Sequence, residues 1–262
     1  MCGGLVFAAA LLAAPSLSWA ASCQDQYLKG AAPRPAFSLS LSTTRELCYD
    51  DFAVLHSGAA RTPFYSAEHL TAANVRAARQ TERVDVFHEE SFLPPTQRAA
   101  LKDYTRSGYD RGHMAPSGDM PNSTAQAQSF TLANMAPQAP ALNRGLWEEI
   151  EETARGMAER DGDVYIVTGP LYANDVTKLN GRVAVPSGFF KAIYSERSHQ
   201  VGAYVAANVA NASVETISLA QLRDRSGFDV FPTLPANVKT QPADLPNPHR
   251  TRVASVGEGL RE

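Results

Sequence analysis

Ser107-Gly108-Tyr109-Asp110-Arg111-Gly112-His113-Met114-Ala115-Pro116-Ser117-Gly118 is the stretch that decides how this chain folds, and a second pattern follows it. That pattern repeats every four residues and comprises Asn143, Trp147, Glu151 and Arg155. Because four residues advance about 400° around an α-helix, these side chains fall on one slowly drifting face. A face built only for packing would be apolar, and only Trp147 qualifies. The pattern therefore predicts a helix that presents an amide, a carboxylate and a guanidinium to a site.

Other segments show strand-like or helical patterns. Continuous or alternating apolar residues predict strands, while the 3.6-residue period, capping signals and breakers predict helices. These patterns predict strands over residues 45–56, 129–134, 163–169, 189–194 and 201–209, and helices over residues 96–103, 141–159 and 218–227.

Composition and charge are those of an ordinary globular protein. Its 262 residues are 44% hydrophobic and 19% charged, so we expect one catalytic domain with a large core. The formal net charge of −3 is not typical of a protein that holds nucleic acid through a broad basic surface. An enzyme can turn over without binding tightly, however. The expected class is therefore an enzyme rather than a stable nucleic-acid binder.

The first 22 residues contain no charged side chain. They run through the apolar residues 5–12 and end on the small-residue pattern Ser18-Trp19-Ala20-Ala21, which predicts a secretory signal peptide over residues 1–21. Pro15 and two serines interrupt the apolar stretch, which disfavours a transmembrane helix. A lipid anchor on Cys23 is a weaker alternative, because the preceding residues match lipoprotein signals poorly.

These signals predict the domain organisation and the location of the protein. We expect a catalytic domain over residues 22–235, followed by a flexible tail over residues 236–262 that is rich in Pro, Asn, Thr and Arg. We also expect a secreted or periplasmic protein without stable membrane association.

Three cysteines fit an exported protein. Cys2 would leave with the signal peptide, so Cys23 and Cys48 remain as a pair, and an even count in an oxidising compartment predicts a disulfide. Two unrelated thiols are the alternative. The cysteines are too few for a four-thiolate zinc site.

The two opening patterns suit the hydrolysis of a phosphodiester. This reaction needs a base for water and a cation to neutralise phosphoryl and leaving-group oxygens. His113 is a candidate base because imidazole titrates near neutrality. Asn143 can offer an amide oxygen to Mg²⁺, and Glu151 can hold the metal's waters. Alone, a histidine in a turn is more often structural and an asparagine before a helix is more often an N-cap; the joint occurrence favours a site.

At these residues the chain resembles the DNA/RNA non-specific endonuclease family, the ββα-metal or His-Me finger nucleases. Asp110-Arg111-Gly112-His113 matches the signature tetrad of that family, and Asn134-Met135-Ala136-Pro137-Gln138 matches its next block. The four-residue stripe from Asn143 matches the metal helix in residue type and spacing. The resemblance covers roughly residues 45 to 235.

The resemblance implies a fold and a set of roles. The fold is α+β, with a central, mostly antiparallel sheet flanked by helices. His113 resembles the general base, Asn143 the sole protein ligand of the metal, and Glu151 the carboxylate that orients the metal's waters. The remaining members are transition-state or substrate-binding arginines and supporting residues, namely Arg83, Arg155, Arg111 and Asn134. Arg76 and Arg79 lie close to Arg83 and remain alternatives for the upstream arginine.

The implied activity is that of a sugar-non-specific endonuclease. It would use Mg²⁺, with Mn²⁺ as a substitute, and would cut both DNA and RNA. One alternative is a phosphodiesterase of the same fold that acts on small nucleotide esters. Another is an inactive nucleic-acid-binding homologue, which would normally have lost His113, Asn143 or Glu151. The sequence predicts neither the oligomeric state nor an inhibitor protein, nor a preference between DNA and RNA.

Overall fold

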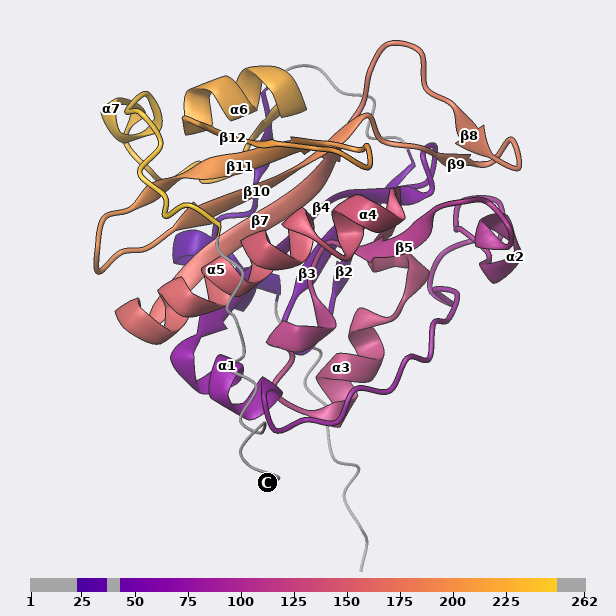
Figure 1. Ribbon diagram of the computed structural model, residues 1–262, viewed down its shortest axis with the longest axis horizontal. Coiled ribbons are helices and arrows are strands. Elements are labelled where there is room, and N and C mark those ends of the chain that lie inside the picture. Colours follow the sequence, from indigo (N-terminus) through magenta and orange to yellow (C-terminus); the bar gives the residue numbers. More distant parts are fainter. Residues whose placement is uncertain (1–22, 37–42, 249–262) are drawn as a thin grey trace, which may run out of the picture.

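A seven-stranded antiparallel sheet forms the centre of the protein (Figure 1). The computed structural model describes residues 23–36 and 43–248, so the expected signal peptide over residues 1–21 lies outside the described residues. The strand order is β12-β11-β10-β7-β4-β3-β2, and every neighbouring pair is antiparallel. This arrangement confirms the predicted α+β fold with a central antiparallel sheet.

The described elements are short strands and helices around that sheet. The sheet contains β2 Thr44–Cys48, β3 Ala53–Ser57, β4 Thr62–Thr71, β7 Asp163–Leu171, β10 Gly188–Tyr194, β11 Val201–Ala207 and β12 Val214–Ile217. Three smaller pairs are β1 Arg34–Pro35 with β13 Phe228–Asp229, β5 Asp110–His113 with β6 Met135–Gln138, and β8 Lys178–Leu179 with β9 Val183–Ala184. The helices are α1 Ala72–Ala78, α2 Leu101–Tyr104, α3 Ser123–Ser129, α4 Pro140–Asn143, α5 Leu146–Asp161, α6 Leu219–Ser226 and α7 Ala236–Lys239. Single 3₁₀ turns are η1 Cys23–Gln26, η2 Leu28–Gly30, η3 Ser117–Asp119 and η4 Leu132–Asn134.

The two faces of the sheet belong to two hydrophobic cores. Because successive side chains of a strand point to opposite faces, Ala67 and Val167 pack with Leu222 of α6 on one face. Ile166 packs with Ile150 of α5 on the other face. Figure 1 shows α5 running across this second face, while α6 and α7 lie on the opposite side. The second face is the one that carries the site.

Three sequence predictions need correction. The single strand expected over residues 45–56 is β2 and β3, joined by a turn in which Tyr49 N donates to Phe52 O; two adjacent aspartates favour that turn. The strand expected over residues 129–134 is wrong, because this segment completes α3 and forms η4. A short apolar run does not distinguish a strand from a helix end. Of the helix expected over residues 96–103, only α2 forms.

The helix expected over residues 141–159 is divided. It comprises α4 and α5, with a break at Gly145, whose φ is −128° and ψ is −107°. A Cβ atom at Gly145 would lie 2.7 Å from the carbonyl oxygen of Ala141, so the break needs a glycine. Asn143 therefore ends α4, whereas the other members of the four-residue stripe lie on α5.

Both ends of the described chain are tied to the sheet. The Cys23–Cys48 disulfide confirms the predicted pair and joins η1 to β2. At the other end, Asp244 N donates to Val201 O and Tyr204 Oη donates to Pro246 O. Residues 236–248 of the expected flexible tail thus lie against β11, and residues 249–262 lie outside the described residues. Among the described residues, no helix is long and apolar enough to span a bilayer.

Candidate active site

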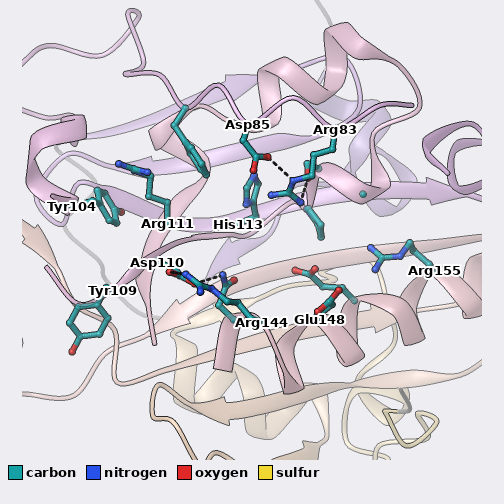
Figure 2. Close-up of a pocket in the computed structure, with 16 residues that line it drawn as sticks. Arg83, Asp85, Tyr104, Tyr109, Asp110, Arg111, His113, Arg144, Glu148 and Arg155 are labelled. Carbon is teal, nitrogen blue, oxygen red and sulfur yellow. Dashed lines mark hydrogen bonds and ion pairs between the residues drawn. The ribbon is translucent and has the colours of Figure 1, made fainter. Parts of the chain in front are cut away.

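A cavity of about 620 Å³ lies where β5, α5 and residues 83–87 meet (Figure 2). It is lined by six of the seven predicted catalytic and metal residues, namely Arg83, Arg111, His113, Asn143, Glu151 and Arg155. The cavity is also lined by polar and aromatic residues to which the sequence patterns gave no role, including Asp85, Tyr104, Asp110, Ser117, Arg144 and Glu148. Most of these residues lie within or beside the two opening patterns, but the spacing of those patterns does not indicate which of the neighbouring side chains face the cavity.

His113 is the last residue of β5, and its ring is packed between aromatic side chains. The ring centroid lies 5.0 Å from that of Phe130, edge to face, and 5.8 Å from that of Phe87. Nε2 is buried and has no hydrogen-bond partner among the described residues. Burial, and then the positive charge of Arg83, lower the pKa of His113 to about 3. The imidazole is therefore neutral at neutral pH, and one of its nitrogens is not engaged by the protein.

The orientation of the Asn143 amide is fixed by Asp110. The Nδ2 atom of Asn143 donates to Asp110 Oδ2 over 2.9 Å. Arg144 donates to the same carboxylate from Nε (2.8 Å) and Nη2 (2.7 Å). Since an ionised carboxylate only accepts hydrogen bonds, the amide nitrogen must face Asp110. The carbonyl oxygen of Asn143 is thereby left available to another group.

Arg155 is held rigidly on α5. Its Nη1 donates to Asp119 Oδ1 and its Nε to Glu152 Oε2, both over 2.8 Å, and its side chain is 11% exposed. A Cβ atom at Gly118 would lie 3.2 Å from Arg155 Nη1, so the glycine gives the guanidinium room beside the loop after β5. One helical turn before Arg155, burial raises the pKa of Glu151 to about 7, although Lys191 and Arg155 act against this rise.

The upstream arginine of the site is Arg83. Its Nε donates to Asp85 Oδ1 over 2.6 Å and its Nη1 to Ser117 Oγ over 2.9 Å. By contrast, Arg79 pairs with Glu152 and Glu159 outside the cavity lining, and Arg76 is exposed on α1. Of the three candidates named from the sequence, Arg83 is thus the arginine that lines the cavity.

Asn134 is the predicted site residue that the structure does not bring to the cavity. It is fully buried. Its Oδ1 accepts from Ser66 Oγ and Ala115 N, and its Nδ2 donates to the carbonyls of Ala115 and Ser129. Because the amide is fully used by these four hydrogen bonds, Asn134 acts by anchoring the chain just after His113 to β4.

A cluster of three polar side chains lies beneath α5, inside the second hydrophobic core. Glu68 of β4, Thr168 of β7 and Lys191 of β10 face the same side of the sheet and are all buried. Lys191 Nζ donates to Thr168 Oγ1 over 2.7 Å. Both carboxyl oxygens of Glu68 lack a hydrogen-bond partner among the described residues. Burial, together with the nearby Asp119, raises the pKa of Glu68, and Lys191 opposes this.

Comparison with known proteins assigns this combination of fold and cavity to one family. The family described as DNA/RNA non-specific endonuclease matches residues 30–237. The chain belongs to this family. It is thus a member of a family of metal-dependent enzymes that hydrolyse nucleic acids.

Relatives of known name support the assignment to the non-specific endonucleases. Nuclease C1 of Cunninghamella echinulata var. echinulata is 32% identical over 206 residues, which cover 71% of this chain and 82% of that protein. The mitochondrial nuclease EXOG of Homo sapiens is 33% identical over 222 residues, covering 76% of this chain and 60% of that protein. The solved structure of an EndoG/EndoGI complex superposes with a TM-score of 0.69 at 27% identity, covering 77% of this chain and 89% of that one. The chain therefore spans most of the length of some relatives and about three fifths of others.

The donor set in the cavity fits a hard divalent cation that keeps most of its water. Asn143 offers a neutral oxygen whose direction is fixed by Asp110, and Glu151 lines the same cavity. Among the described residues, the one cluster of three His, Cys, Asp or Glu ligand atoms is at Cys23, Glu46 and Cys48, where the two thiols are bonded to each other. A site with few protein ligands suits Mg²⁺, because this ion binds oxygen atoms and keeps most of its water molecules.

Proposed function

We propose that this protein is a Mg²⁺-dependent endonuclease that hydrolyses phosphodiester bonds in both DNA and RNA, with Mn²⁺ able to replace Mg²⁺. The observation that carries the proposal is the position of His113. Its neutral ring has a nitrogen without a hydrogen-bond partner among the described residues, and it lines a cavity that also contains an oriented amide oxygen, a carboxylate and several arginines. These are the groups that phosphodiester hydrolysis requires.

In this proposal each of five cavity residues has one role in the hydrolysis. His113 accepts the proton of the attacking water, and the negative charge of a bound phosphate raises its low pKa towards the working range. Arg83 and Arg155 donate to phosphoryl oxygens, where guanidinium groups match the developing charge. Asn143 would bind the cation and Glu151 would orient the waters of that cation, which would supply Lewis-acid stabilisation of phosphoryl and leaving-group oxygens.

Cleavage assays on polymeric substrates test the activity. We expect purified protein to nick supercoiled plasmid and to degrade single-stranded RNA in the presence of Mg²⁺, and EDTA to abolish both reactions. Asn143→Ala should need far more Mg²⁺ for half-maximal rate, whereas Asn237→Ala, at an exposed asparagine of α7 outside the cavity lining, should not. Cleavage of dinucleotide esters without cleavage of polymers would favour a small-ester phosphodiesterase. Binding of DNA without any cleavage would favour an inactive homologue.

We further propose that the protein is exported and acts in the periplasm or outside the cell. The charge-free apolar segment over residues 1–21 and the Cys23–Cys48 disulfide support this location, although relatives include mitochondrial nucleases. Mass spectrometry of protein from the culture medium or periplasm should show an N-terminus near residue 21 or 22 and no free thiol on Cys23 or Cys48. Recovery of the intact chain from the cytoplasm with both thiols reduced would contradict export.

A further inference from the structure

Three of the four arginines that line the cavity already hold a carboxylate. These ion pairs are Arg83 with Asp85, Arg144 with Asp110, and Arg155 with Asp119. Within the described part of the chain, no carboxylate forms an ion pair with the fourth arginine, Arg111. The positive charge of Arg111 is therefore the one least compensated by the protein.

Two aromatic rings take the place of a carboxylate around Arg111. Its guanidinium carbon lies 4.8 Å from the ring centroid of Phe87 and 5.7 Å from that of Tyr104. Its Nε is buried and has no hydrogen-bond partner in the part of the chain that the structure describes. An aromatic face attracts a cation through its quadrupole and adds no negative charge. The rings thus hold the guanidinium in place while its net charge stays available to an anion in the cavity.

The contribution of Tyr104 lies in its ring, not in its hydroxyl. Tyr104 is buried at the end of α2, and its Oη has no hydrogen-bond partner among the described residues. Phe87 also contacts His113 and Phe130, so changes at Phe87 would disturb the base directly. Of the two rings, Tyr104 is the one that can be altered to test Arg111 separately.

The position of Arg111 points to a second phosphate. Figure 2 shows Tyr104 and Arg111 on one side of His113, with Arg83 and Arg155 on the other side. A phosphodiester attacked beside His113 can engage Arg83 and Arg155, whereas the chain of a polynucleotide continues towards Arg111. Base-independent phosphate contacts of this kind position a nucleic acid without reading its sequence.

We propose that Tyr104 is a positioning residue that clamps Arg111 against Phe87, so that Arg111 binds the backbone phosphate next to the one that is hydrolysed. This inference rests on the proposed endonuclease function and extends it to a second phosphate site. If Tyr104 acts only through Arg111 and the second phosphate, its effect depends on the length of the substrate and not on the sugar or the base.

Binding measurements test the clamp apart from catalysis. In a His113→Ala background, a fluorescein-labelled single-stranded DNA oligonucleotide is titrated by anisotropy at several salt concentrations. Tyr104→Phe keeps the ring and should bind as the parent does. Tyr104→Leu should bind about tenfold more weakly, and its slope of log affinity against log salt should fall by about 0.7, the value for one lost phosphate contact on a single strand. The double variant Tyr104→Leu/Arg111→Gln should bind the oligonucleotide no more weakly than Arg111→Gln alone.

Cleavage of substrates that differ in length provides the second arm, with an active His113. On a dinucleoside monophosphate, which has a single phosphate, Tyr104→Leu should leave kcat/KM unchanged. On a longer oligonucleotide the same variant should lower kcat/KM about tenfold, because the contact between Arg111 and the second phosphate is lost. If Tyr104→Leu does not fold, as judged by circular dichroism, Tyr104→Met fills the space without an aromatic face and takes its place in every assay.

Several outcomes would overturn the clamp. They are an unchanged salt slope in the leucine or methionine variant, an equal loss in Tyr104→Phe, an additive loss with Arg111→Gln, or an equal effect on both substrate lengths. These outcomes differ from failure of the proposed function, in which the unsubstituted protein would cleave no nucleic acid.

Discussion

Asp110 and Asn143 are joined by a hydrogen bond of 2.9 Å between residues that lie 33 positions apart in the chain. The bond decides which end of the Asn143 amide faces the cavity, because the carboxylate can accept only from nitrogen. Asp110 is in turn held by two donors of Arg144. The asparagine proposed to bind the cation is therefore oriented from outside the cation site.

This relationship predicts that Asp110→Asn weakens metal binding. The substituted amide can present its own nitrogen to Asn143, which removes the preference for one amide orientation. We expect the affinity for Mn²⁺, measured by isothermal titration calorimetry, to fall about 10–100-fold, as is typical when a residue that orients a ligand is lost. Arg144→Gln keeps the hydrogen bond between Asp110 and Asn143, so it should reduce the affinity for Mn²⁺ less than Asp110→Asn does. Equal affinities in Asp110→Asn and the unsubstituted protein would contradict the orienting role.

Replacement of His113 tests the proposed base. His113→Ala should lower kcat on plasmid DNA by about 10²–10⁴-fold or more, the usual cost of losing a general base, while far-UV circular dichroism stays unchanged. His199 is exposed on the β10–β11 connection, so His199→Ala serves as the matched control and should retain full activity. A His113→Ala protein within a few-fold of normal turnover would remove His113 from the mechanism.

Two groups of the cavity should give opposite pH dependences of stability in metal-free protein. Glu151 titrates at about 7 in the fold against 4.5 ordinarily, so its stabilisation is complete below pH 4.5 and is lost as pH rises to 7. His113 titrates at about 3 against 6.5, so its stabilisation is complete above pH 6.5 and is lost as pH falls towards 3. Between pH 4.5 and 6.5 the two effects oppose each other.

Single substitutions should therefore separate these two effects. In urea titrations at pH 5 to 6.5 with EDTA, Glu151→Gln should make the free energy of unfolding rise more steeply with pH, by about 1.4 kcal/mol per pH unit for one proton. His113→Gln should change the slope by a similar amount in the opposite direction. Parallel curves for the two variants would contradict the assigned pKa shifts.

The buried Lys191 should be important for stability. Lys191→Met removes the buried hydrogen bond from Lys191 Nζ to Thr168 Oγ1 and a positive charge that acts on Glu68, and leaving a buried polar group without its partner costs about 1–3 kcal/mol. The double variant Glu68→Gln/Lys191→Met should recover a large part of that loss in urea unfolding followed by circular dichroism. A double variant no more stable than Lys191→Met would show that the two side chains do not interact.

The Cys23–Cys48 disulfide should affect stability and leave turnover unchanged. It closes a sequence separation of 25 residues, for which the chain-entropy estimate is roughly 3 kcal/mol. Neither cysteine lines the cavity. Reduction by dithiothreitol, or the Cys23→Ser/Cys48→Ser variant, should lower the melting temperature while kcat at 25 °C stays the same. A loss of kcat that parallels the fall in melting temperature would connect η1 to the site.

Local patterns predicted the elements whose signals are continuous in sequence. The apolar run became β7, and Ser218 with Gln221 forms the capping box that begins α6. The break at Gly145 was missed because the four-residue spacing of Asn143 and Trp147 continues across it. Periodicity reports which side a residue faces and does not report whether the backbone between two residues is helical.

Residues that act through distant partners were less visible. Asp110 was read only as part of a motif, because its partners on α4 and beside it are brought close by the fold. Lys191 is the one charged residue of the apolar strand β10, and Glu68 lies in the mixed strand β4 next to His69, so neither residue gives a periodic signal. Asn134 was predicted as a site residue from resemblance, whereas its four hydrogen bonds place it in the interior.

Gly145 separates the helix that carries Asn143 from the helix that carries Glu151. On one uninterrupted helix, the separation of Asn143 and Glu151 would be fixed by a rise of about 1.5 Å per residue. Because the two residues lie on either side of Gly145, its backbone angles set that separation instead. A substitution at this glycine, which does not line the cavity, would thus change how well a hydrated cation fits between the amide of Asn143 and the carboxylate of Glu151.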